Sequence, residues 1–209
     1  MKEIKDKMRA VIIAAGKIDN YNYIKSFINK TDFVICADGG YNHAEKMGIN
    51  PHILIGDFDS IKNKNSIQPN TKILEYPSNK DFTDTELSIN YAIENNYKEI
   101  LLLAGIGNRI DHTLANILLL SKFKNVTIIN ENNKIYTGND ITLKEQKGTI
   151  VSLIPISYCS GIFSVNLHYE LNNFSMEVGN TIGISNVMTN DIANIKIKNG
   201  ILFVIVSKD

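Results

Sequence analysis

Short apolar runs alternate with amphipathic stretches through the first part of the 209-residue chain. Runs of this kind, separated by helical patterns, are typical of a mostly parallel α/β sheet. We therefore expect residues 1–136 to form an N-terminal α/β domain. The predicted strands are Ala10–Ala15, Phe33–Ala37, Ile53–Ile55, Ile73–Tyr76, Ile100–Ala104 and Val126–Ile129.

Two helix beginnings are visible between these strands. The segment Thr83–Glu86 fits a capping box, with Thr83 as N-cap and Glu86 three residues later. The segment Asp111–Thr113 opens an apolar stretch over Leu114–Lys122, and an acidic residue there suits the positive end of the helix dipole. The sequence thus predicts helices that start close behind strands.

The pattern changes after Tyr136, because no convincing helical period is found in residues 137–209. Short apolar segments separated by Gly, Asn and Ser are instead typical of a small β-sandwich or barrel. We expect a smaller C-terminal all-β domain here. Its predicted strand segments are Ile141–Leu143, Thr149–Ile154, Gly161–Tyr169, Phe174–Val178 and Ile192–Val206.

Charge and cysteine content narrow the class of protein. The 22 basic and 22 acidic residues give a formal net charge of zero, which argues against a nucleic-acid partner. The segment Met1–Arg9 carries both signs of charge, and the apolar run after it ends at Gly16, too short for a signal peptide or a membrane span. Cys36 and Cys159 lie far apart, so we expect both to be reduced in a cytoplasmic protein without a membrane partner.

Two carboxylates, Asp57 and Asp59, follow the apolar run Pro51–Ile55 at a spacing of two residues. If the strand alternation continues through them, both side chains share a face and can point at one spot. Like charges held this close repel, so a cation between them is favoured. Mg²⁺ takes one or two carboxylates together with water and substrate phosphates, and is therefore the predicted metal.

Three further polar clusters follow other predicted strands. Asp38–Gly40 offers glycines that let backbone N–H groups approach a phosphate, and Lys80–Asp84 adds polar groups at a helix N-terminus. The glycine loop Gly105–His112 contains Arg109, which can grip a phosphate with two hydrogen bonds. Because the carboxyl ends of parallel strands meet at one edge of a sheet, these clusters predict a site for phosphoryl-type transfer.

In this order, the clusters resemble the motif set of the thiamine pyrophosphokinase (thiamine diphosphokinase) family. The resemblance implies an N-terminal α/β catalytic domain, a C-terminal β-sandwich, and a homodimer whose active sites lie between subunits. It also implies transfer of a diphosphate group from ATP to the hydroxyl of thiamine, with Mg²⁺ and release of AMP. The segments that carry it are Ala37–Gly40, Gly56–Ser60, Lys80–Glu86, Arg109–His112 and Gly183–Asn186.

The resemblance also implies roles for single residues. Asp57, Asp59 and Asp84 would hold metal and phosphates, and the reaction would depend on Asp59, Asp84 and Arg109, with either of these two carboxylates as proton acceptor. Ser185 and Asn186 would face the pyrimidine of thiamine. The residues expected on the nucleotide side are Asp38, Gly39, Gly40, Asp81, Thr83, Arg109, Asp111 and His112.

The sequence departs from the family pattern in three places. Asn108 precedes Arg109 where the family usually has glycine, and the segment Asn166–Leu171 replaces the usual Gly-Leu-Lys-Tyr-Pro-Leu. The chain has no Trp, so any aromatic wall for thiamine must come from Tyr, Phe or His.

Two other functions account for part of the pattern. Metal-dependent nucleotide-sugar transferases also use Asp-x-Asp to hold a nucleotide diphosphate, but that function leaves Lys80–Glu86 and Arg109–His112 unexplained. A catalytically silent regulator that binds nucleotide or thiamine is the non-enzymatic alternative. The intact set of acidic residues argues against it.

Overall fold

The computed structural model describes residues 9–208, so the charged segment Met1–Met8 lies outside the described residues. The chain divides into two compact units. The first holds residues up to 119 together with 128–131, and the second holds residues 120–127 and 132–209. The boundary between residues 136 and 137 stays a prediction. Over the described part of the chain, no helix has the length and apolar character needed to cross a membrane.

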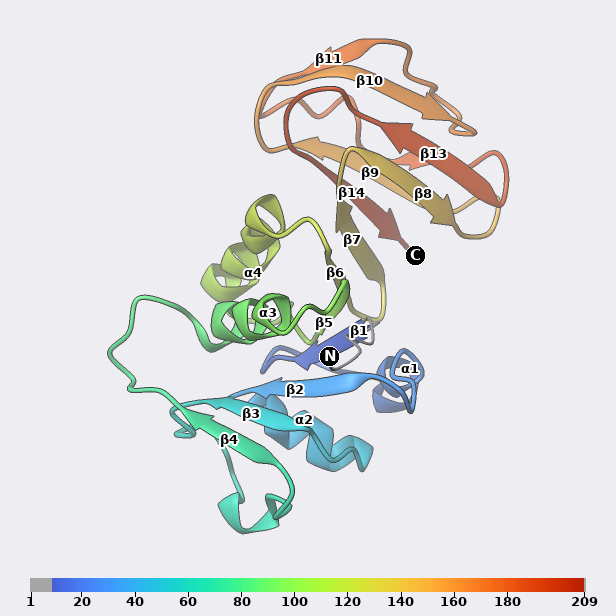
Figure 1. Cartoon of the computed structure of the whole chain (residues 1–209). Coiled ribbons are helices and arrows are strands. Elements are labelled where there is room, and N and C mark those ends of the chain that lie inside the picture. The colour runs from blue at the N-terminus through green and yellow to red at the C-terminus, as the bar shows by residue number, and fades with distance from the viewer. Residues whose placement is uncertain (1–8, 209) are drawn as a thin grey trace, which may run out of the picture. The chain divides into compact units, whose positions relative to one another are not determined.

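A parallel sheet forms the centre of the first unit, with strand order β5-β1-β2-β3-β4 (Figure 1). The central strands β1, β2, β3 and β5 are nearly continuous apolar runs, as expected for strands covered on both faces, whereas the edge strand β4 is largely exposed. The predicted mostly parallel α/β sheet is confirmed. Its strands are β1 (Arg9–Ile13), β2 (Phe33–Ala37), β3 (Ile53–Gly56), β4 (Lys72–Glu75) and β5 (Glu99–Leu103), and β6 (Val126–Ile129) follows at the division between the units.

Helices α2 (Gly40–Met47) and α3 (Asp84–Glu94) cover opposite faces of this sheet (Figure 1). The N-cap of α3 is the predicted one, since the Glu86 amide donates to Thr83 Oγ1 at 3.2 Å. Helix α4 starts at Ile110, slightly earlier than expected. The other helical segments are α1 (Tyr21–Lys25), α4 (Ile110–Lys122) and the single 3₁₀ turn Lys64–Ser66.

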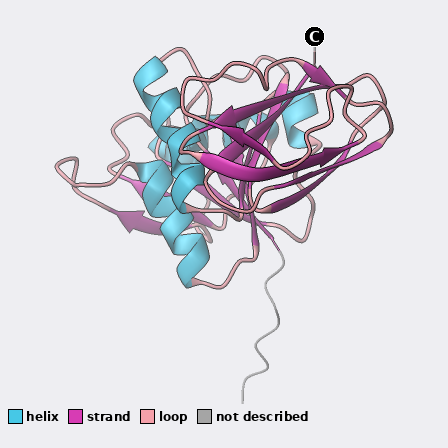
Figure 2. Cartoon of the chain, turned by 90° about the horizontal axis from the view of Figure 1, so that it is seen from above, coloured by secondary structure: helices cyan, strands magenta, loops and turns pink. Residues whose placement is uncertain are grey.

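The second unit is an antiparallel β-sandwich, as predicted. One of its layers has the strand order β12-β9-β14-β7, and the other has the order β11-β10-β13-β8. Apolar side chains of both layers form one core. The strands are β7 (Asn133–Thr137), β8 (Asp140–Lys144), β9 (Ile150–Pro155), β10 (Cys159–Val165), β11 (Phe174–Met176), β12 (Asn186–Val187), β13 (Ile192–Lys196) and β14 (Leu202–Ser207). In Figure 2 strands are magenta and helices cyan; all helices of the described residues precede residue 123.

Two predicted strands of this unit have different limits in the structure. The stretch Ile192–Val206 is two strands, because the chain turns at Gly200, whose φ is +99° and where a Cβ would lie 2.3 Å from the Tyr158 carbonyl oxygen. The segment predicted to run to Tyr169 stops as a strand at Val165. Residues 166–171 form a loop instead.

Candidate active site

A cavity of about 620 Å³ opens at the carboxyl ends of the parallel strands, within the first unit. The predicted motifs converge on it, although they come from four different places in the sequence. Its lining includes Asp38, Asp57, Lys80, Asp84, Arg109 and His112.

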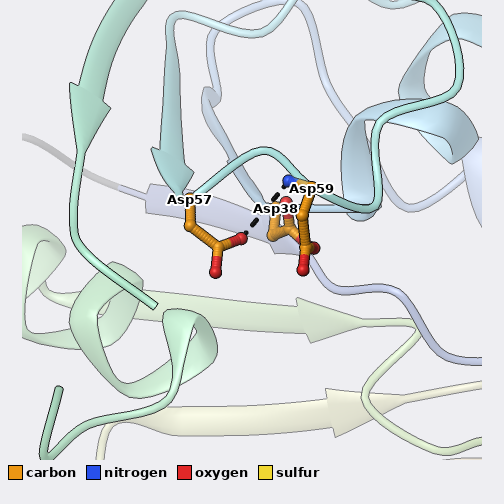
Figure 3. A group of neighbouring side chains, drawn as sticks. All are labelled: Asp38, Asp57 and Asp59. Carbon is orange, nitrogen blue, oxygen red and sulfur yellow. Dashed lines mark hydrogen bonds between the residues drawn. The ribbon is translucent and has the colours of Figure 1, made fainter. Parts of the chain in front are cut away.

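Three carboxylates gather at this edge of the sheet. Oxygen atoms of Asp38, Asp57 and Asp59 lie within 4.8 Å of one another (Figure 3). Asp38 Oδ1 is buried and has no hydrogen-bond partner among the described residues. A buried carboxylate oxygen without a partner is costly, and a cation satisfies it. Several carboxylate oxygens around one point are the ligands of a hard cation, so this group fits Mg²⁺.

The convergence of Asp57 and Asp59 comes from a turn. Strand β3 ends at Gly56, so the expected strand alternation is not the reason that these side chains meet. Phe58, between them, has a φ of +65°, which a bulky residue rarely adopts. Its side chain is only 8 % exposed and packs in the hydrophobic core. The buried ring therefore anchors the turn that presents both carboxylates.

Asp84 begins α3 and lines the same cavity, but it lies outside the group of three carboxylates. Its Oδ1 contacts Lys80 Nζ at 2.9 Å. Burial raises the pKa of Asp84, and the charges of Asp38 and Asp57 add to this, whereas Lys80 opposes it. The hydroxyl of Ser78 lowers the pKa of Asp57. A carboxyl with a raised pKa suits a proton acceptor.

Arg109 and Asp111 form an ion pair beside the cavity, with Nη2 and Oδ2 2.6 Å apart. This hydrogen bond lowers the pKa of Asp111 to about 2. Packing favours a glycine at position 107, because a Cβ there would lie 3.0 Å from the Cα of Gly16, closer than an ordinary van der Waals contact. Asn108 does not have a positive φ, so the departure from the family's glycine at this position introduces no backbone strain.

Four residues expected on the nucleotide side do not line the cavity: Gly39, Gly40, Asp81 and Asp111. Gly39 and Gly40 are buried, and a Cβ on Gly40 would lie 1.9 Å from the Ile13 carbonyl oxygen. Glycine is therefore needed there for α2 to begin against the end of β1. Asp81 is exposed and stands outside the lining.

The segment Ala14–Lys17, which follows β1, also lines the cavity and was not among the predicted site residues. The Gly16 amide donates to the Ala104 carbonyl at 2.8 Å, and a Cβ on Gly16 would lie 2.3 Å from that oxygen. His43 Nε2 donates to the Gly16 carbonyl at 2.7 Å, and the Tyr21 hydroxyl donates to His43 Nδ1 at 2.9 Å. Burial lowers the pKa of His43. The available signal was a run of small residues at the carboxyl end of the first strand.

Ser185 and Asn186 belong to the second unit. Ser185 is exposed, has a φ of +57°, and its amide donates to Ser152 Oγ at 3.1 Å. Asn186 is buried, and its side-chain amide bonds the backbone of Tyr169.

A parallel sheet with an acidic cluster, a helix N-terminus and basic side chains around a cavity at its carboxyl edge is typical of enzymes that transfer phosphoryl-type groups from nucleotides. The family model for the thiamin pyrophosphokinase catalytic domain matches residues 24–132, and that for the thiamin pyrophosphokinase vitamin B1 binding domain matches residues 139–202. The chain belongs to the thiamine pyrophosphokinase family, which is a family of diphosphotransferase enzymes.

Known proteins of this family can be aligned with most of the chain. The thiamine pyrophosphokinase of Bacillus subtilis is 30 % identical, with 95 % of this chain and 98 % of that protein covered. Thiamin pyrophosphokinase 1 of Caenorhabditis elegans is 29 % identical, over 87 % of this chain and 82 % of that protein. The crystal structure of the Bacillus subtilis enzyme superimposes with a TM-score of 0.85 at 26 % identity, covering 96 % of this chain and 99 % of that one. These findings favour the pyrophosphokinase over the sugar transferase and the silent regulator.

Proposed function

We propose that this chain transfers the diphosphate group of ATP to the hydroxyl of thiamine, giving thiamine diphosphate and AMP with Mg²⁺. The observation that carries this proposal is the acidic cluster with its unpartnered Asp38 oxygen beside a cavity of about 620 Å³. A cavity of this size lies within the usual range for small-molecule sites.

Asp38, Asp57 and Asp59 would hold Mg²⁺, which would neutralise phosphate charge when bound. Lys80 and Arg109 bring positive charge to the same cavity, where it can meet the phosphates and the charge that develops on them. The hydroxyl of thiamine loses a proton as its oxygen attacks the β-phosphorus. We assign Asp84 as the acceptor, because its raised pKa and its place in the lining suit that task. In this assignment Asp59 acts as a metal ligand.

The thiamine side of the proposal uses the second unit, where the vitamin B1 binding model matches and where Ser185 and Asn186 lie. We propose a homodimer in which each active site combines the acidic edge of one chain with the Ser185 segment of the other. We also propose a cytoplasmic location, which the free, buried thiols of Cys36 and Cys159 support.

One reaction tests the chemistry. Protein, ATP, Mg²⁺ and thiamine are mixed, and the products are identified by mass spectrometry against a reaction with excess chelator. We expect AMP and thiamine diphosphate only when the metal is present. ADP with thiamine monophosphate would contradict diphosphate transfer, and turnover of a sugar nucleotide in place of ATP would favour the transferase.

Mixed dimers test the shared site. Chains with Asp59→Asn are unfolded and refolded with an equal amount of Ser185→Ala/Asn186→Ala chains, where each homodimer alone is nearly inactive. Random pairing makes half of the dimers mixed, and each of these has one intact site, so activity should return to about a quarter of wild type. A mixture as inactive as its parents, beside wild type that refolds well, would show that each site is built within one chain.

A further inference from the structure

Two neighbouring polar side chains in the first turn of α2 contact different loops of the candidate site. Asn42 bonds the loop that follows β3, and His43 bonds the loop that follows β1. Ser60 of the first loop and Gly16 of the second both line the cavity. Helix α2 therefore touches the site in two places, although neither side chain lines the cavity itself.

The side-chain amide of Asn42 makes three hydrogen bonds to the backbone. Its Nδ2 donates to the Gly39 carbonyl at 3.1 Å and to the Ser60 carbonyl at 3.0 Å. Its Oδ1 accepts from the Lys62 amide at 3.0 Å. Both N–H groups and the oxygen are thereby used, so the amide is fixed in one orientation.

These bonds join the backbone behind two of the three clustered carboxylates. Gly39 directly follows Asp38, and Ser60 directly follows Asp59. The Ser60 hydroxyl also donates to Asp59 Oδ1 at 2.8 Å. One amide thus sets the spacing between carboxylates that follow two different strands, β2 and β3. Mg²⁺ requires near-ideal geometry at short distances, so a change in this spacing lowers affinity.

His43 is held in one tautomer. A carbonyl oxygen can only accept, so the Nε2 that lies 2.7 Å from the Gly16 carbonyl carries the proton, and Nδ1 accepts from the Tyr21 hydroxyl at 2.9 Å. Burial lowers the pKa of His43, and the positive charges of Lys46 and Lys62 act in the same direction. The ring is therefore a neutral, oriented donor.

The residue that receives this bond belongs to a pair of joined loops. The Gly16 amide donates to the Ala104 carbonyl at 2.8 Å, and the Lys17 amide donates to the Ile106 carbonyl at 2.9 Å. These bonds connect the loop after β1 with the loop after β5, which carries Arg109. The imidazole therefore ties both loops to α2.

We infer that Asn42 and His43 are positioning residues with separate tasks. Asn42 sets the carboxylates for the metal, and His43 sets the loops after β1 and β5 for the phosphates of the nucleotide. The inference rests on the proposed function, because Mg²⁺ and ATP are the ligands it names. A residue that merely stabilises this edge of the sheet would affect both ligands together, so the separation of the two effects is the quantity to measure.

The test of Asn42 measures metal binding apart from turnover. In Asn42→Ala the dissociation constant for Mg²⁺, measured by calorimetry without nucleotide, should rise about fivefold. The KM for ATP at saturating Mg²⁺ should stay within about twofold of wild type. The control is Asn95→Ala, which removes a side-chain bond to the Tyr91 carbonyl at the far end of α3 and should match wild type.

His43 should give the opposite result. In His43→Leu the KM for ATP at saturating Mg²⁺ should rise about fivefold, while the dissociation constant for Mg²⁺ stays within about twofold of wild type. His43→Gln keeps a donor for the Gly16 carbonyl and should restore most of the affinity for ATP. If His43→Leu does not fold, Tyr21→Phe replaces it, because it removes the hydroxyl that orients the ring; an unchanged KM would then overturn the role of His43.

The outcomes distinguish the inference from the function on which it rests. Wild type that forms thiamine diphosphate, beside variants that change both constants equally or neither, overturns the inference and leaves the function intact. Asn42→Ser, whose hydroxyl can replace one bond, should fall between Asn42→Ala and wild type; loss of the fold in both variants would make Asn42 a residue of stability alone. Wild type that binds no Mg²⁺ and forms no thiamine diphosphate overturns both the function and the inference.

Discussion

Replacing Asp38 with Asn should make the metal-free protein more stable and should lower the turnover of the enzyme. The side chains have nearly the same shape, and Asn tolerates the φ of +42° found at this position. With carboxylate oxygens within 4.8 Å, each pair of unit charges repels by about 1–3 kcal/mol at effective dielectric constants between about 80 and 20. Because Asp59 is exposed, we take the lower end of this range for each of the two pairs that Asp38 forms. Asp38→Asn should then relieve about 2 kcal/mol, which raises the melting temperature by roughly 4–8 °C in chelator.

The assay is thermal unfolding in excess chelator and again in excess Mg²⁺, with turnover measured beside it. Bound metal stabilises the folded state by mass action, so wild type should gain from Mg²⁺ and Asp38→Asn should gain less. Turnover of the variant should fall at least about 100-fold. Glu45→Gln, which removes an exposed carboxylate from α2, is the control and should change neither measurement. The reasoning is refuted if Asp38→Asn lowers the melting temperature in chelator and responds to Mg²⁺ as wild type does.

Three further predictions concern two residues of the cavity lining, Arg109 and Asp84, and His43, which bonds the lining residue Gly16. Arg109→Lys keeps the charge but loses the pair of parallel hydrogen bonds that a guanidinium can donate, so kcat should fall at least about tenfold without a change in melting temperature. If Arg109→Lys and Arg109→Ala both have the kcat of wild type, Arg109 is a surface residue without a role in the reaction. Asp84→Asn removes the proposed proton acceptor and should lower kcat at least about 100-fold while the KM for ATP changes less, and near-normal kcat would assign the proton transfer elsewhere. The pKa of His43 is lowered in the folded state, so protonation favours the unfolded chain and stability falls with pH below about 6.5. His43→Gln can still donate to the Gly16 carbonyl, and chemical denaturation at about pH 7.5 and 5.5 should show a smaller loss of stability than wild type; an equal loss would remove His43 from the argument.

The parallel sheet could be predicted because its central strands β1, β2, β3 and β5 are buried on both faces and read as continuous apolar runs. Strand β7 was missed for the opposite reason. Its five residues, Asn133–Thr137, hold only Ile135 and Tyr136 as apolar side chains, so the alternation is too short to recognise. The segment Ile192–Val206 was predicted as one strand because a single glycine is a weak turn signal. The close packing at Gly200 is visible only in the structure.

For the candidate site, the sequence predicts which segments meet but not the role of each residue within them. A glycine at position 40 is compatible with phosphate binding and with close packing of a helix start, and only the structure shows the contact with the Ile13 carbonyl. Asp38 and Asp84 are both acidic residues in the predicted motifs, and only the course of the backbone shows that Asp38, not Asp84, lies beside Asp57 and Asp59. Ala14, Ala15 and Gly16 have no reactive side chains, so only their small size and the neighbouring Lys17 mark this segment as cavity lining.

Phe58 gives the acidic cluster a property that its carboxylates alone would lack. A left-handed bulky residue costs about 1–2 kcal/mol, and in this turn the cost is offset by burial of the ring in the core. A chain whose core is not yet packed has no such compensation, so the turn relaxes and Asp57 and Asp59 move apart. We therefore expect the three carboxylates to come together only when the core is packed, so that a nascent or damaged chain lacks the proposed metal site.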